Sequence, residues 1–277
     1  MSEGIARAEH ASASLATEHD ATISVWMGAL DGTPRLVRDA GHEHPAASTL
    51  KLPLLVAVHR AAEEGRLHLD DELAVHEEFA STVDGRSFRN TADYDNDPAP
   101  WARLGERATI GWLTERSIVL SSNLATNLLI ERIGIDAVND VYDAAGAKAA
   151  RLRRPIQDEP ASDAGIFNTA TAADLAQVLV ALCGGRLLPP ARTAEVERVL
   201  AACETNDAIP AGLPPGTYIA HKTGWIDEAC HDVGIVRPAG EEPFILSIFT
   251  GAELDDPAAH RLVARVAAEC WAARSDY

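Results

Sequence analysis

The sequence has few lysines, a deficit of positive charge and no long apolar run. Lysine occurs only three times in 277 residues, against 21 arginines, and the formal net charge at pH 7 is −18. Because nucleic acids and anionic membranes attract basic surfaces, this balance argues against either as a partner. No apolar stretch approaches the roughly 20 residues of a transmembrane helix, so we predict no membrane span.

Cysteine is also sparse, and its spacing fits neither a redox motif nor a metal site. The chain has four cysteines, at positions 183, 203, 230 and 270. The pairs of possible ligands at 42–44 (His-Glu-His) and 230–231 (Cys-His) supply two groups each and have no matching partner pair. We therefore predict free thiols, no metal and no cofactor.

The first 27 residues contain four acidic side chains and no apolar block, which is unlike a secretory signal peptide. The sequence predicts a cytoplasmic protein, or a secreted one if a leader was removed. Hydrophobic residues make up 47% of the chain, enough for one large core. We expect a single domain, 1–277, acting as a monomer or weak homodimer.

Extended segments are predicted near both ends of the chain. Residues 22–30 and 34–40 resemble strands joined by the turn signal Asp31-Gly32. Three more strands are predicted at 217–225, 231–238 and 243–251, and terminal helices at 4–19 and 257–273. Strands from both ends can form one antiparallel sheet of about five strands covered by these helices.

Helical patterns fill the middle of the chain. The segment 48–65 is apolar on nearly every side, as a central helix would be, and Gly65 ends it. Further helices are predicted at 109–119, 122–133, 136–145, 171–183 and 190–203, while 80–100 is predicted to be a polar surface excursion. The predicted fold class is α+β, with a sheet lobe (1–45 and 213–277) and a helical lobe (46–212).

One of the rare lysines lies three residues after a serine, at the start of the central helix. Ser48 and Lys51 would share one face of a helix. A lysine in an apolar setting loses its proton more easily and can then activate a hydroxyl, which arginine cannot do. The alternative is a helix-capping serine with a lysine that reaches water. Chance would give roughly 0.14 Ser-x-x-Lys matches in such a chain.

Two further motifs follow in the chain. Residues 121–123 read Ser-Ser-Asn, although either serine could simply cap the next helix. Residues 222–224 read Lys-Thr-Gly on a predicted strand, a match expected by chance on the order of 0.01 times. The alternative for Lys222 is an exposed lysine on an edge strand.

The order Ser-x-x-Lys, Ser-x-Asn, Lys-Thr-Gly resembles the serine β-lactamase and penicillin-binding protein family, most closely the class A β-lactamases. The resemblance covers nearly the whole chain. It implies a sheet lobe beside a helical lobe, and a small-molecule β-lactam, amide or ester as substrate.

The resemblance also implies residue roles. Ser48 would be the acylated nucleophile and Lys51 its proton partner, while Ser121 would relay a proton to the leaving nitrogen. Asn123 would bind the side-chain carbonyl of the substrate. The resemblance assigns attraction of the substrate carboxylate to Lys222 and Thr223, close approach of substrate to Gly224, and the oxyanion hole to the backbone N–H groups of Ser48 and Trp225.

The loop between the two halves of the helical lobe departs from the family pattern. The Glu-x-x-Leu-Asn motif, which supplies the base that activates water in class A enzymes, is absent from 151–170. Glu159 is the best substitute base and Asp158 the second, unless both are solvated loop acids. Asn168 replaces a common aspartate, which weakens an ion pair with Arg153 or Arg154.

Several functions remain open at this point. The first is a serine hydrolase that opens β-lactams through an acyl-enzyme on Ser48. The second is an esterase, amidase or acyl transferase of the same fold acting in secondary metabolism. A D-alanyl-D-alanine peptidase is disfavoured by the missing leader, and a catalytically silent binding protein by the intact motifs.

Overall fold

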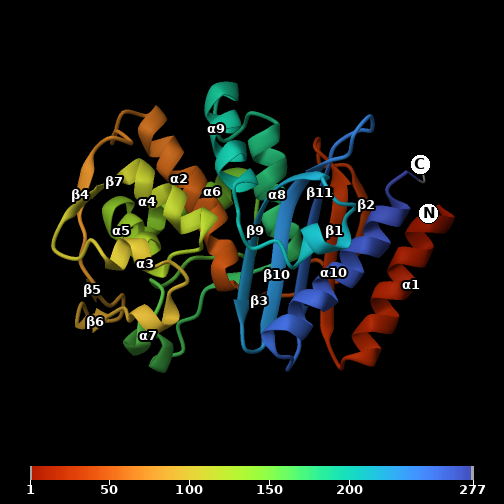
Figure 1. Ribbon diagram of the computed structural model, residues 1–277, viewed down its shortest axis with the longest axis horizontal. Helices are drawn as coiled ribbons and strands as arrows, with labels where there is room; N and C mark the ends of the chain where they lie inside the picture. The colour runs from red at the N-terminus through yellow and green to blue at the C-terminus, as the bar shows by residue number, and fades with distance from the viewer. Residues whose placement is uncertain (1, 276–277) are drawn as a thin grey trace.

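The computed structural model describes residues 2–275, so the outermost residues of the predicted domain, 1 and 276–277, lie outside it. Figure 1 shows a helical lobe beside a sheet lobe, with both chain ends on the sheet lobe. The terminal helices α1 (Glu3–Glu18) and α10 (Asp256–Ala273) pack against each other there.

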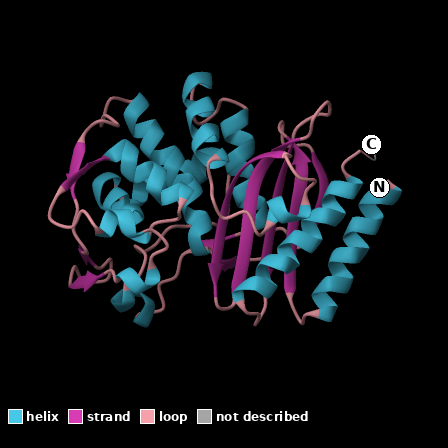
Figure 2. Ribbon diagram, in the orientation of Figure 1, coloured by secondary structure: helices cyan, strands magenta, loops and turns pink. Residues whose placement is uncertain are grey.

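The sheet lobe is built on one five-stranded antiparallel sheet of order β2-β1-β11-β10-β9 (Figure 2). Its strands are β1 (Thr22–Ala29), β2 (Pro34–Arg38), β9 (Tyr218–Ile226), β10 (Ala229–Arg237) and β11 (Phe244–Gly251). The first strand therefore pairs with the last along its full length. This pairing closes the chain on itself and leaves β9 at the edge that faces the helical lobe.

Helices cover both faces of this sheet, which explains why its inner strands are apolar throughout. In β11, Leu246 and Ile248 join the core beneath α1 and α10, whereas Ile245 and Phe249 point to the other core, shared with the helical lobe. This alternation follows from the two-residue period of a strand. A strand with both faces covered carries hydrophobic residues on each.

The helical lobe contains the remaining long helices. They are α2 (Lys51–Glu63), α4 (Ile110–Val119), α5 (Asn123–Ile133), α6 (Ile135–Ala145), α8 (Ala172–Cys183) and α9 (Pro190–Ala201), with short helices α3 (Pro98–Trp101) and α7 (Glu159–Asp163). The 3₁₀ turns are η1 (Ala47–Leu50), η2 (Ala92–Tyr94) and η3 (Ile209–Gly212). Short two-stranded ladders pair β3 (His44–Pro45) with β8 (Thr169–Ala170), β4 (Glu72–Ala74) with β7 (Arg107–Thr109), and β5 (Glu78–Ala80) with β6 (Ser87–Arg89).

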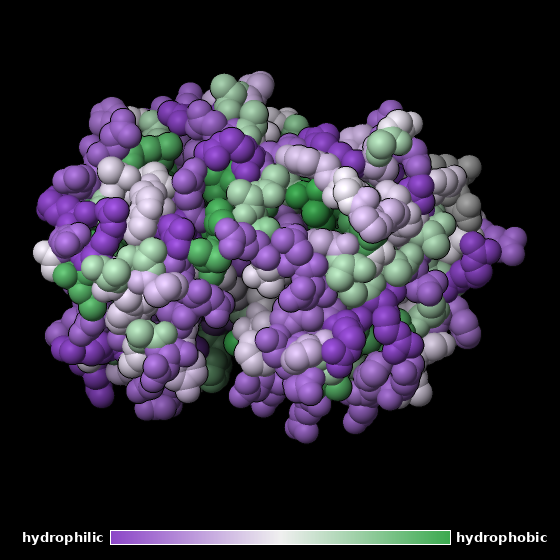
Figure 3. Space-filling model, in the orientation of Figure 1, coloured by the Kyte–Doolittle hydropathy of each residue, from purple (hydrophilic) through white to green (hydrophobic). Residues whose placement is uncertain are grey.

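The surface is largely polar in the view of Figure 3, with hydrophobic side chains in small separate patches. Among residues 2–275, no helix has the length and apolar character needed to cross a membrane.

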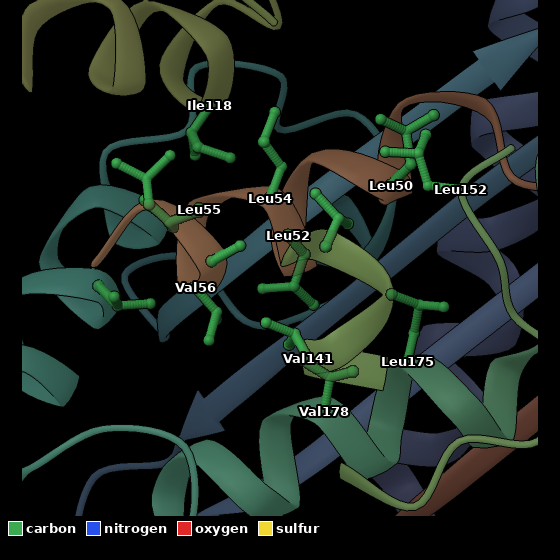
Figure 4. Close-up of a cluster of buried hydrophobic side chains, with 14 of the residues drawn as sticks. Leu50, Leu52, Leu54, Leu55, Val56, Ile118, Val141, Leu152, Leu175 and Val178 are labelled. Atoms are coloured by element: carbon green, nitrogen blue, oxygen red, sulfur yellow. The ribbon is translucent and has the colours of Figure 1, made fainter. Parts of the chain in front are cut away.

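Helix α2 forms the centre of the helical lobe, as its apolar sequence predicts. Every residue from 51 to 59 is buried. Figure 4 shows Leu52 and Val56 of α2 close to Val141 of α6, and α2 also packs on α4, α5 and α9. The helix ends before Gly65, whose φ of +69° favours glycine.

The predicted fold class is confirmed, and the long helices and sheet strands lie within a few residues of the predicted ranges. Two details differ. Helix α2 begins at Lys51, because Ser48 lies in the preceding turn η1. The predicted excursion contains η2, most of α3 and most of the β5–β6 ladder, and it buries Phe88 and Asp97, so it is packed rather than purely a surface loop.

Candidate active site

The side chain of Lys51 is fully buried at the first position of α2. Its Nζ atom lies 2.6 Å from the carbonyl oxygen of Ser121, 3.1 Å from Ser121 Oγ and 2.8 Å from Asn123 Oδ1. The alternative of a lysine that reaches water is therefore excluded, and Lys51 joins the first two sequence motifs.

The surroundings of Lys51 favour its neutral form. Burial lowers its pKa well below that of a free lysine, the positive charge of Lys222 lowers it further, and Asp95 acts in the opposite direction. A neutral amine has two donor hydrogens and one lone pair. It can donate its two hydrogens to two of the three oxygens around it, Ser121 O, Ser121 Oγ and Asn123 Oδ1, which leaves the lone pair free to accept a proton.

Ser48 lies one turn before Lys51 and lines a hollow of about 600 Å³, which we call the Ser48 cleft. Its walls come from segments within 43–50, 154–157, 167–169 and 225–228, together with Asn123. In the described part of the chain, no hydrogen bond joins the Ser48 hydroxyl to Lys51. Such bonds often tighten only when substrate binds.

Strand β9 lies directly against the turn that carries Ser48. A Cβ atom added to Gly224 would stand 2.7 Å from Ser48 N, 2.9 Å from Thr49 N and 3.1 Å from Ala47 Cβ. These distances are too short for any side chain. Position 224 therefore requires glycine for a packing reason, and β9 brings its neighbour Trp225 to the wall of the cleft.

Lys222 is buried on β9, so it is not an exposed edge-strand lysine. Its Nζ atom donates to the carbonyl of Thr223 at 2.8 Å. Burial lowers the pKa of Lys222, whereas Cys203 and Asp232 act to raise it. The positive charge of Lys222 is close enough to lower the pKa of Lys51.

The turn 121–123 is strained and well anchored. Ser121 has a φ of +58°, in the left-handed region that costs a non-glycine residue about 1 kcal/mol or more. Ser122 caps α5, since its Oγ accepts from Ala125 N at 3.2 Å. The side-chain amide of Asn123 donates to the carbonyl of Tyr94.

The loop 151–170 presents an apolar residue and an amide to the cleft in place of a carboxylate. Ile156 and Gln157 line the Ser48 cleft. Asp158 is buried, and its Oδ2 accepts from Thr82 N at 3.0 Å while its Oδ1 caps α7 at Ala161 N, 3.1 Å away. Glu159 is exposed at the start of α7 and does not line the cleft.

Asn168 stabilises the same loop without an ion pair. Its Oδ1 accepts from the backbone N–H groups of Arg153, at 2.7 Å, and Arg154, at 3.0 Å. Its Nδ2 donates to the carbonyl of Arg154 at 2.9 Å. The sequence suggested only that Asn168 weakens an ion pair with Arg153 or Arg154. In the structure its side-chain amide instead hydrogen-bonds the backbone of the loop.

His44 lines the cleft, and His231 packs beside it. His44 Nε2 bonds Ser24 Oγ at 2.9 Å, and burial, with smaller contributions from His231 and His42, lowers the pKa of His44 to about 3. Within residues 2–275, no group of three or more His, Cys, Asp or Glu side chains is arranged to hold a metal ion.

The structure thus brings Ser48, Lys51, Ser121, Asn123 and the 222–225 segment together, and it leaves Glu159 apart. Sequence reasoning missed two residues that shape the site, Asp95 and Asn127. Asn127 follows Asn123 by one helical turn, a spacing that could have indicated it. Asp95 is 26 residues before Ser121 and carries no local signal.

Comparison with known proteins identifies the family of this chain. The sequence profile of the β-lactamase enzyme family matches residues 7–273. A β-lactamase from Rhodobacter capsulatus is 28% identical over 214 residues, covering 75% of this chain and 69% of that protein. A β-lactamase from Mycobacterium tuberculosis is 26% identical over 252 residues, covering 86% of this chain and 75% of that protein.

Solved structures show the same fold. A mutant of the class A β-lactamase of the last common ancestor of Gram-negative bacteria superposes with a TM-score of 0.83 at 24% identity, covering 96% of this chain and 98% of that one. A mutant of PBP-A, solved as an acyl-enzyme complex with penicillin G, superposes with a TM-score of 0.81 at 24% identity, covering 98% and 97%.

Proposed function

This chain belongs to the β-lactamase enzyme family, and we propose that it is a serine hydrolase that opens β-lactams, or related amides and esters, through an acyl-enzyme on Ser48. The observation that carries the proposal is the buried amine of Lys51, which bonds Ser121 and Asn123 and lies one turn from the cleft-lining Ser48. The β-lactamase relatives and the penicillin complex of PBP-A support the substrate class.

The proposed acylation involves three proton transfers, which together carry one proton from Ser48 to the leaving nitrogen, and it exchanges the C–N bond for a C–O bond. Ser48 Oγ attacks the carbonyl carbon and gives its proton to neutral Lys51. The oxyanion that forms is stabilised by the backbone N–H groups of Ser48 and Trp225. The C–N bond then breaks, the leaving nitrogen takes the proton of Ser121, and Lys51 returns a proton to Ser121.

Substrate placement relies on the two flanking segments. Lys222 and Thr223 would attract a carboxylate of the substrate, because buried Lys222 is a positive charge in an otherwise acidic protein. The amide of Asn123 would bind the carbonyl of the acyl side chain. Its Oδ1 accepts from Lys51 and one Nδ2 hydrogen is given to the carbonyl of Tyr94, which leaves the second Nδ2 hydrogen as the donor to substrate.

The part of the loop 151–170 that lines the cleft carries no carboxylate to activate water for release of the acyl group. The predicted base, Glu159, lies outside the cleft, and the carboxylate of Asp158 is engaged by Thr82 and α7. The carboxylates that line the cleft, Glu43 and Glu228, come from other segments. Since general bases contribute about 10²–10⁴-fold, we propose that water releases the acyl group slowly.

This observation favours a second candidate function, transfer of the acyl group to a nucleophile other than water. Such an enzyme would act on an amide or ester and would turn over β-lactams weakly or not at all. It would share the acylation machinery and differ only in the acceptor. The two candidates therefore predict the same adduct and different lifetimes for it.

Intact-protein mass spectrometry after incubation with a penicillin and a cephalosporin tests both. An adduct on Ser48 that is lost within seconds supports the hydrolase, and one that persists for hours supports acyl transfer to another acceptor. The variant Ser48→Ala should form no adduct. Turnover that survives in Ser48→Ala would rule out the proposed nucleophile, and no adduct and no turnover with either compound would contradict β-lactam chemistry.

A further inference from the structure

The carboxylate of Asp95 lies at the N-terminus of α5, although it comes from the segment 80–100. Its Oδ2 atom accepts from Leu124 N at 2.8 Å, Ser122 Oγ at 3.1 Å and Trp101 Nε1 at 3.0 Å. Its Oδ1 accepts from Asp97 N at 3.1 Å. A carboxylate at this position also interacts favourably with the helix dipole.

These contacts hold the turn that bonds Lys51. Asp95 binds Ser122 and Leu124, and the carbonyl of the preceding residue, Tyr94, accepts from the amide of Asn123. Three consecutive residues are thereby tied to one short segment. The strained backbone of Ser121 immediately precedes them, and such strain persists only where the surroundings impose it.

Asp95 also supplies negative charge near the amine. The charged groups that act on Lys51 are Lys222 from β9 and Asp95 from the segment 80–100. Burial and Lys222 both favour the neutral amine, whereas Asp95 favours the ammonium form. Asp95 therefore opposes an excessive loss of basicity in the group that must accept a proton from Ser48.

We propose that Asp95 is a positioning residue for acyl transfer, which fixes the turn carrying Ser121 and Asn123 and sets the electrostatic environment of Lys51. This inference rests on the proposed function. Asp95 is not part of the cleft lining and hydrogen-bonds Ser122 and Leu124, so we assign it an effect through the 121–124 segment and through its charge.

The test compares Asp95→Asn with Asp93→Asn, a change at an exposed neighbour in the same segment. The measured quantity is the rate of Ser48 acylation by penicillin G and by an activated p-nitrophenyl ester, between pH 5 and 9. We expect Asp95→Asn to slow acylation roughly a hundredfold. The acidic limb of its pH profile should move to lower pH, because loss of the negative charge lowers the pKa of Lys51.

The outcomes separate this inference from the proposed function. If the wild-type protein is acylated by neither reagent, the proposed function fails. If it is acylated and Asp95→Asn reacts at the same rate with an unmoved limb, the role of Asp95 is overturned. A slower rate with an unmoved limb and a lower melting temperature would show a merely structural role and would also overturn it.

A second variant covers the case in which Asp95→Asn does not fold. Trp101→Phe removes only the indole N–H that orients Asp95 and leaves the carboxylate charged. We expect acylation to slow several-fold, with the pH limb in place. Wild-type rates in Trp101→Phe, together with an unfolded Asp95→Asn, would overturn the proposal.

Discussion

The side-chain amide of Asn127 brackets the backbone of Ile156 on both sides. Its Oδ1 accepts from Ile156 N at 2.8 Å, and its Nδ2 donates to Ile156 O at 2.7 Å. Asn127 is buried on α5, one turn from Asn123. Through Asn127, the residue of the loop 151–170 that is fixed to α5 is therefore an isoleucine that lines the cleft.

A carboxylate at this position should accelerate release of the acyl group. We predict that Ile156→Glu shortens the lifetime of a penicillin adduct on Ser48 about 10²-fold, because it places a general base on the anchored part of the loop. Time-resolved mass spectrometry of the adduct measures this lifetime. The comparison requires that the wild-type protein form a penicillin adduct that persists long enough for its lifetime to be measured.

Glu159→Gln is the matched comparison for Ile156→Glu. Because Glu159 is exposed and outside the cleft, its loss should leave the adduct lifetime unchanged. A lifetime lengthened tenfold or more in Glu159→Gln would instead identify Glu159 as the base. An unchanged lifetime in Ile156→Glu would show that residue 156 does not reach the acyl group.

Lysine at position 51 is predicted to be essential for its ability to lose a proton. Lys51→Arg keeps a positive charge but cannot act as a base, so acylation of Ser48 should fall about 10³-fold or more. The matched control is Lys148→Arg, at the exposed third lysine, which should react as the wild type does. Acylation of Lys51→Arg within tenfold of wild type would rule out this base.

Close packing at position 224 should make even a methyl group harmful. Gly224→Ala would place Cβ within 3 Å of Ser48 N and Thr49 N, and would push β9 away from η1. A shift of about 1 Å can cost roughly 10²-fold in rate, so acylation should fall by that factor.

Gly41→Ala is the control, since nothing lies within 4 Å of its added Cβ. Stopped-flow acylation kinetics and circular dichroism of both variants separate a local displacement from unfolding. Wild-type kinetics in Gly224→Ala would contradict the close approach of β9 to Ser48.

The buried histidines should destabilise the fold as the pH falls. Burial lowers the pKa of His44 to about 3 and that of His231 to about 4, from an ordinary 6.5. Below pH 6.5 the unfolded chain binds more protons at these sites than the folded one, so the free energy of unfolding decreases toward pH 4.

His44→Gln should remove one of these contributions. We expect the variant to lose about 1.5 kcal/mol less stability than wild type between pH 6.5 and 5, measured by urea unfolding at each pH. His68→Gln, at an exposed histidine, should follow the wild-type curve. Parallel curves for His44→Gln and wild type would contradict a neutral buried His44.

The fold could be predicted from local patterns because each main element carries its own signal. These signals depend on residues within a few positions of one another. Examples are the apolar run of α2, the glycine that follows it, and the residues of β11 that alternate between two hydrophobic cores. The small ladders and α7 escaped prediction, since elements of two to five residues are too short to establish a period.

The sequence by itself was enough to predict the fold class and to select Ser48 and Lys51 as the candidate nucleophile and its proton partner. Helical spacing and the three motifs are local properties of the sequence. Only the tertiary structure decided which loop residue faces the cleft. In the folded protein, Asn127 hydrogen-bonds the backbone of Ile156, which lines the cleft, whereas Glu159 is exposed to solvent. The tertiary structure alone also revealed that Asp95 lies against Ser122. Such contacts join distant segments through packing and burial, and no short stretch of sequence encodes them.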